Sequence, residues 1–115
     1  MEAKVSTPAE LTDGMDLFHA ESNRSLAQLL EMVVEYDRRG LWRPDGATSM
    51  ASWLCFQFGL TPRIGRDWVE VAHALAERPA IKTEFVEGRL SFEQVKYACR
   101  LATPETDGEW AEEAR

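Results

Sequence analysis

Apolar residues along this chain recur every three or four positions, which is the spacing of one face of an α-helix. The longest such pattern lies between about Asp16 and Arg39, and its apolar members are Leu26, Leu29, Leu30, Val33 and Tyr36. Gly40 follows as a typical stop residue. We therefore predict one long amphipathic helix in the first part of the chain.

A separate short helix is predicted ahead of the long one. Thr7-Pro8-Ala9-Glu10 combines an N-cap threonine, a proline at the first helical position and a glutamate at the third. Gly14 would end this helix. We accordingly assign residues 1–14 to an N-terminal arm and residues 15–115 to a helical domain.

Five further helices are predicted downstream. Thr48 or Ser49 caps a helix that runs to Phe58, and apolar residues surround this helix, as they do in a buried element. Pro62 begins the next helix, whose apolar stripe continues to Leu75. The last three are expected at about Ile81 to Glu87, after the capping box Ser91-Phe92-Glu93-Gln94, and from Thr103-Pro104-Glu105 through Trp110.

No segment alternates polar and apolar residues as a β-strand does, so the predicted fold is all-α, a compact multi-helix bundle. At 115 residues the chain can bury one core without a metal or a disulfide. Cys55 and Cys99 lie in apolar helical patterns and indicate buried thiols in a reducing compartment. The N-terminus lacks the pattern of a signal peptide and no apolar run could span a bilayer, so we expect a cytoplasmic protein without a membrane partner.

Charge is distributed unevenly along the chain. The net charge is −7, yet residues 38–66 carry five bases and one acid, whereas the segments on either side are acidic. The bases are Arg38, Arg39, Arg43, Arg63 and Arg66, and the acid is Asp45. Clustered arginines suit the phosphates of nucleic acid, although solvated surface is the common alternative.

This basic cluster overlaps a helix-turn-helix-like unit at about residues 49–76. Such a unit needs two closely crossing helices, a tight turn with glycine, and a second helix whose exposed start can enter the major groove. Gly59 supplies the turn and small Cys55 suits the crossing. Gly65 departs from the pattern, because a β-branched core residue usually stands there. The same residues also fit two bundle helices joined by a short turn.

The predicted DNA contacts are six exposed polar residues around this unit. They are Thr61, Arg63 and Arg66 at the start of the second helix, where backbone amides also favour phosphate, and Arg38, Arg39 and Arg43 as further phosphate contacts. Trp42 is a candidate aromatic contact, because it lies in a loop between arginines. The acidic residues from Glu105 to Glu113 are expected to form a solvated helix face.

Six ordered blocks of residues are similar to a known family. They are Asp37-Arg38-Arg39-Gly40-Leu41-Trp42-Arg43, Asp45-Gly46-Ala47 with Ser49-Met50-Ala51 and Trp53-Leu54, Gly59-Leu60-Thr61-Pro62, Val71-Ala72 with Ala74-Leu75, Glu87-Gly88-Arg89-Leu90-Ser91 with Gln94-Val95, and Ala102-Thr103-Pro104-Glu105. Over about Leu26 to Trp110 the chain resembles the N-terminal part of the 13E12 repeat family, an actinobacterial domain of formally unknown function. That domain commonly precedes an HNH endonuclease domain, so the resemblance implies mobile-element, phage or DNA-processing biology.

The sequence lacks the residues of a nuclease. An HNH site needs two histidines and an asparagine or equivalent on a ββα-metal unit, whereas His19 and His73 are the only histidines and both lie on predicted helices. We therefore expect no enzyme, no catalytic residue, no metal and no cofactor.

The function predicted from the sequence is a DNA-binding helical module without a nuclease part, with double-stranded DNA as its partner. The alternative is a helical protein-interaction or dimerisation module, which would bind a second copy or another chain without contacting DNA. The acidic surfaces and the long helix at Asp16 to Arg39 favour that alternative.

Overall fold

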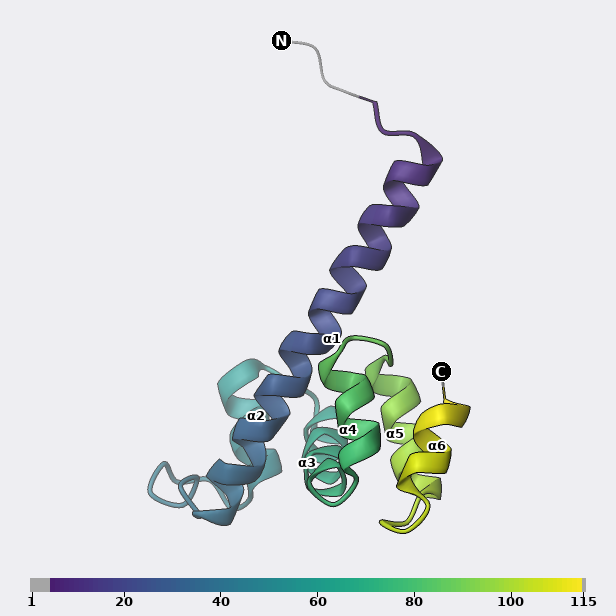
Figure 1. The fold of residues 1–115 in the computed structure, drawn as a ribbon. Helices are drawn as coiled ribbons and strands as arrows, with labels where there is room; N and C mark the ends of the chain where they lie inside the picture. The colour runs from purple at the N-terminus through teal and green to yellow at the C-terminus, as the bar shows by residue number, and fades with distance from the viewer. Residues whose placement is uncertain (1–4, 115) are drawn as a thin grey trace.

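The N-terminal helix, α1 (Pro8–Arg38), has a first half that stands clear of the other helices (Figure 1). The computed structural model describes residues 5–114. Thr7 caps α1 as predicted, because its hydroxyl accepts a hydrogen bond from the Glu10 N–H at 3.1 Å and the Glu10 carboxylate accepts one from the Thr7 N–H at 3.3 Å. A complete capping box therefore fixes the start of this helix.

Gly14 does not end a helix, so the predicted break between a short and a long helix is wrong. A stop glycine adopts a positive φ, and Gly14 is not among the glycines that do so. The residues that follow, Met15 to Leu17, include no helix breaker. Once a helix has formed, each further residue adds a backbone hydrogen bond, so the helix continues. The predicted boundary after residue 14 falls inside α1.

Five shorter helices form a bundle beside the second half of α1, and α2, α3 and α4 contact α1 (Figure 1). They are α2 (Met50–Phe58), α3 (Pro62–Ala76), α4 (Pro79–Val86), α5 (Phe92–Leu101) and α6 (Asp107–Glu113). No strand occurs between residues 5 and 114, which confirms the all-α prediction. α3 lies in the middle of the bundle, in contact with α1, α2, α4 and α5. Within the same residues, no helix combines the length and apolar character that a membrane crossing needs.

Within residues 5–114, the core joins residues from α1 to α6 and from the loop that precedes α5. Its largest fully buried side chains are those of Phe85, Leu30, Leu54, Ile81, Leu90, Val71 and Val95. The predicted ends of the inner helices are confirmed: Ser49 caps α2, and Ser91 caps α5 with a capping box. Gly59 and Gly88 follow α2 and α4 with φ values of +66° and +78°, where residues with a side chain are strained.

The apolar residues that surround α2 are not all buried, contrary to the prediction. Met50 and Leu54 lie in the core, but Phe58 is 48% exposed and Phe56 is 90% exposed. α2 packs on α3 and less extensively on α1, so its outer side has no neighbour among residues 5–114. The sequence pattern recorded apolar residues on all sides and could not show which sides would be covered.

The last helix also differs from the prediction. Thr103 and Thr106 close a turn, since the Thr103 N–H donates to the Thr106 hydroxyl at 2.8 Å and the Thr106 N–H donates to the Thr103 hydroxyl at 3.2 Å. The helix therefore begins at Asp107 rather than near Pro104. Asp107 is only 5% exposed, so the acidic tail is not entirely a solvated face.

Candidate nucleic-acid interface

The helix-turn-helix-like unit depends on a close crossing of α2 and α3. A Cβ atom added to the buried Gly65 would lie 2.8 Å from Cys55 Sγ and 3.0 Å from the Ala51 carbonyl oxygen. The Cys55 thiol in turn donates a hydrogen bond to the Thr61 carbonyl oxygen at 3.5 Å. Gly65, a departure from the usual sequence pattern, is thus the residue that allows the two helices to meet.

The start of α3 is exposed and has no side-chain cap. Thr61 occupies the N-cap position, but its hydroxyl accepts no hydrogen bond from the helix. The N–H groups of Arg63 and Ile64 belong to the first turn of the helix and have no intrahelical acceptor. Oriented amides of this kind, together with the positive end of the helix dipole, favour a bound anion.

Arg63 and Arg66 extend from this helix start into solvent. Neither guanidinium makes an ion pair or hydrogen bond with residues 5–114. The two acids that follow on α3 are engaged elsewhere: Asp67 lies 3.4 Å from Lys96 Nζ, and Glu70 lies 3.1 Å from Arg100 Nε. Both basic partners come from α5, so α5 partly neutralises the acids of α3 and leaves its two arginines unpaired.

The second group of predicted contacts lies at the C-terminal end of α1 and in the loop that follows it. Arg38 is in its last turn and Arg39 follows it, within 3.9 Å of the Glu35 carboxylate. Arg43, in the loop, places its guanidinium 5.1 Å from the centre of the Trp42 ring. All three arginines are exposed. The Trp42 indole N–H donates to Asp37 at 3.0 Å, so the tryptophan also holds the loop against α1.

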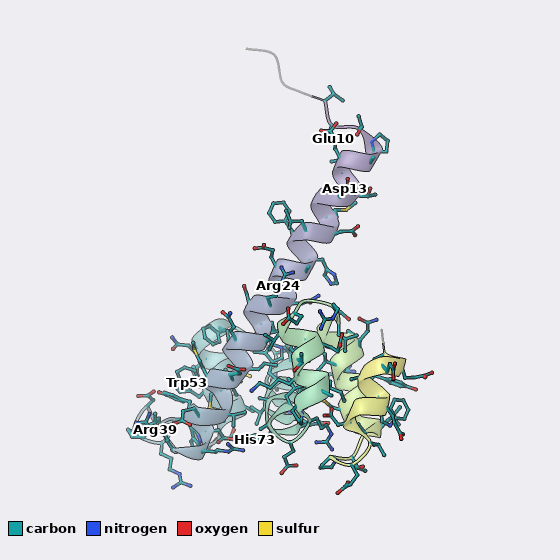
Figure 2. All side chains as sticks on the ribbon, in the orientation of Figure 1. Glu10, Asp13, Arg24, Arg39, Trp53 and His73 are labelled. Atoms are coloured by element: carbon teal, nitrogen blue, oxygen red, sulfur yellow. The ribbon has the colours of Figure 1, made fainter. Side chains whose placement is uncertain are left out.

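The two groups are distinct: Arg66 lines a groove beside α2, whereas Arg38 lines another groove between α1, α3 and α4. His73 Nε2 lies 2.6 Å from Asp37 Oδ2, which joins the second half of α3 to the last turn of α1 (Figure 2). Arg63 is ten residues before His73 and hence about 15 Å further along the α3 axis. Phe56 lines one groove with Arg66 and a second groove with loop residues Asp45 to Ala47.

Asp45, the one acid of the basic cluster, has a structural role that the sequence did not reveal. Its carboxylate accepts a hydrogen bond from the Trp53 indole at 2.8 Å and another from the Tyr36 hydroxyl at 3.0 Å. The two aromatic rings are 4.6 Å apart. Burial, followed by the hydrogen bond to Asp45 and its negative charge, raises the pKa of Tyr36. Asp45 thereby ties the loop to α1 and α2.

The remaining titratable residues do not form a further site. His73 is half-buried on Asp37 and His19 is exposed on the free part of α1. Among residues 5–114, no three histidine, cysteine or acidic side chains meet in a group that could hold a metal ion.

Comparison of the chain with family models, curated proteins and solved structures finds no match. The resemblance to the 13E12 repeat family therefore stays a prediction from the six blocks of residues.

Proposed function

We propose that this protein is a DNA-binding module that presents the start of α3 to double-stranded DNA. The observation that carries the proposal is the pair of unpaired, exposed arginines, Arg63 and Arg66, beside the uncapped N-terminus of the same helix. In this proposal Arg63 and Arg66 reach the groove, and the α3 amides with Thr61 contact a phosphate.

Arg38, Arg39 and Arg43 supply additional phosphate contacts from the end of α1 and its loop. DNA phosphates recur along both strands, so a long duplex that contacts the start of α3 can extend toward this second group. Arg43 is held by its contact with the Trp42 ring, which reduces the side-chain freedom that binding would remove.

The net charge of −7 limits the affinity that this surface can give. The acidic flanks repel a polyanion, whereas the local positive charge attracts it over roughly one Debye length, about 10 Å at 0.1 M salt. We therefore expect binding that is measurable at low salt and weak at high salt.

Fluorescence anisotropy with a labelled duplex at low salt tests the proposal. The Arg63→Ala, Arg66→Ala double variant should bind on the order of tenfold more weakly, because it loses two charge-assisted contacts. The matched control is Arg24→Ala, Lys82→Ala, which removes one exposed and one half-buried positive charge away from the start of α3 and has the same net charge. This control should bind like the unchanged protein.

Two results would refute the proposal. One is the absence of binding to duplex DNA at low salt, which would favour an interaction module without DNA contact. The other is an equal loss of affinity in both double variants, since general electrostatics rather than the α3 surface would then explain the binding.

A further inference from the structure

A regular repeat of residues, apolar except for two serines, runs along α1 beside the face that packs on the bundle. The stripe begins at Leu11 and advances by four and three residues in alternation: Leu11, Met15, Phe18, Ser22, Ser25, Leu29, Met32 and Tyr36. This is the spacing of the contact positions in a coiled coil. The buried residues of α1 are Asn23, Ala27, Leu30, Val33 and Val34, and the stripe residues Leu29 and Tyr36 are partly buried against the same core.

The stripe is exposed over much of its length. Leu11, Met15 and Phe18 are 55%, 63% and 72% exposed on the part of α1 that stands clear of the bundle (Figure 1). Met32, on the part that belongs to the bundle, is 71% exposed. Apolar side chains in such a row are unusual on a surface that has no partner.

The second half of the stripe borders an apolar groove between α1 and α2. Leu29, Met32 and Tyr36 form one side of it, and Trp53 and Phe58 form the other. The first half of α1 therefore has exposed apolar residues, and its second half borders a groove that could receive an apolar helix.

We propose that α1 pairs with α1 of a second copy of this chain, in an antiparallel arrangement. The stripe is complementary to itself in that direction. When Leu11 lies opposite Tyr36 of the other copy, Met15 lies opposite Met32, Phe18 lies opposite Leu29, and Ser22 lies opposite Ser25. The bare half of each copy then covers the grooved half of the other, and the small serines meet at the two-fold axis.

Charges along α1 are compatible with this register. The part of α1 that stands clear carries Glu10, Asp13, Asp16 and Glu21, and none of these lies on the stripe. In the antiparallel register the start of one helix, with Glu10, approaches Arg39 of the other. Figure 2 labels Glu10 and Arg39, which lie at opposite ends of α1. The residues beside the stripe pair without like charges: Glu21 falls near Gln28, and Glu35 falls near Gly14.

The contact is of moderate size. Residues on and beside the stripe from Leu11 to Tyr36 number about fifteen in each copy, against roughly 20–30 for a standard interface. We expect a reversible dimer whose population depends on protein concentration.

Sedimentation equilibrium of the 115-residue chain tests the dimer. Phe18→Glu should raise its dissociation constant by about a hundredfold, because each dimer loses two buried rings. Leu17→Glu is the matched control: Leu17 is 56% exposed and adjacent, but lies off the stripe, so this variant should still dimerise. A concentration-independent monomer, or an equal loss of dimer in both variants, would overturn the proposal.

Disulfide trapping tests the direction of pairing. Met15→Cys and Met32→Cys chains should cross-link to each other when mixed, whereas Met15→Cys alone should not, because its two copies would be about 26 Å apart. The unchanged chain, which contains Cys55 and Cys99, is the background control. Cross-linking of Met15→Cys with itself would indicate parallel helices and overturn the antiparallel register.

Discussion

Gly65 on α3 lies so close to Cys55 on α2 that a Cβ atom at this position would be 2.8 Å from the sulfur. The same Cβ atom would lie 3.0 Å from the Ala51 carbonyl oxygen, so it would have no room on that side either. The crossing of the two helices therefore requires glycine, although glycine within a helix costs about 1 kcal/mol relative to alanine. The position of the α3 N-terminus, and with it that of Arg63, depends on this contact.

Gly65→Ala should destabilise the protein by about 1–3 kcal/mol, because the added methyl group forces α2 and α3 apart. Gly14→Ala is the matched control, since a Cβ there would meet no atom within 4 Å and should stabilise α1 by about 0.5–1 kcal/mol. Urea unfolding of both variants measures the difference. Equal effects of the two substitutions would show that the crossing is not tight.

Asp107→Ala should destabilise the protein by about 2 kcal/mol, because Asp107 caps a helix distant in sequence. Its carboxylate accepts hydrogen bonds from the Ala80 N–H at 2.6 Å and from the Ile81 N–H at 2.9 Å, at the start of α4. Glu109→Ala removes the same charge from an exposed position two residues away and should change stability little. If both variants unfold at the same urea concentration, Asp107 does not cap α4 in solution.

The ionisation of Cys99 should lower the free energy of unfolding of the protein at alkaline pH. Burial, opposed in part by the charge of Arg78, raises the pKa of this thiol from 9.0 to about 11. The unfolded chain then loses the proton at lower pH than the folded protein, so the stabilisation is fully present below about pH 9 and is lost as pH rises to about 11. Unfolding free energies measured under reducing conditions should fall less steeply over this range in Cys99→Ala, by about 2 kcal/mol in total. An identical decline would contradict the role of this thiol.

Asp45→Asn should strengthen DNA binding by a few-fold at low salt, because it removes the one negative charge between Arg38 and Arg66. The asparagine side chain keeps an oxygen that can accept from Trp53 or Tyr36, so the loop should stay in place. Anisotropy measures the affinity, and the near-ultraviolet circular dichroism of the tryptophans checks the loop. An unchanged affinity with an unchanged spectrum would indicate that the loop does not face the duplex.

Local signals predicted most of this fold. The capping residues Thr7, Ser49 and Ser91 and the stop glycines Gly59 and Gly88 act on neighbouring backbone groups, so their roles can be read within a few residues of sequence. The same reasoning wrongly predicts a helix end at Gly14, because a glycine ends a helix only where the following chain turns away.

The features that sequence reasoning missed are contacts between distant segments. Asp107 reaches Ile81 across 26 positions, and Gly65 matters only through Cys55 on the preceding helix. In the sequence Asp45 is only the one acid of the basic cluster, whereas in the structure its carboxylate accepts hydrogen bonds from Tyr36 and Trp53. Spacing along one helix cannot reveal such partners, since they are set by the packing of several helices.

The sequence identifies the predicted contact residues but does not show how they are arranged in space. All six are exposed, as a surface that binds DNA requires. The sequence could not show how Arg63 and Arg66 lie relative to Arg38, Arg39 and Arg43, because that depends on the packing of α3 on α1.

The salt dependence of duplex binding tests the central proposal most directly. The logarithm of the binding constant should fall linearly with the logarithm of salt concentration, and the slope should be smaller by about 2 in Arg63→Ala, Arg66→Ala than in the unchanged protein or in Arg24→Ala, Lys82→Ala. Three equal slopes would contradict a phosphate-binding role for the start of α3.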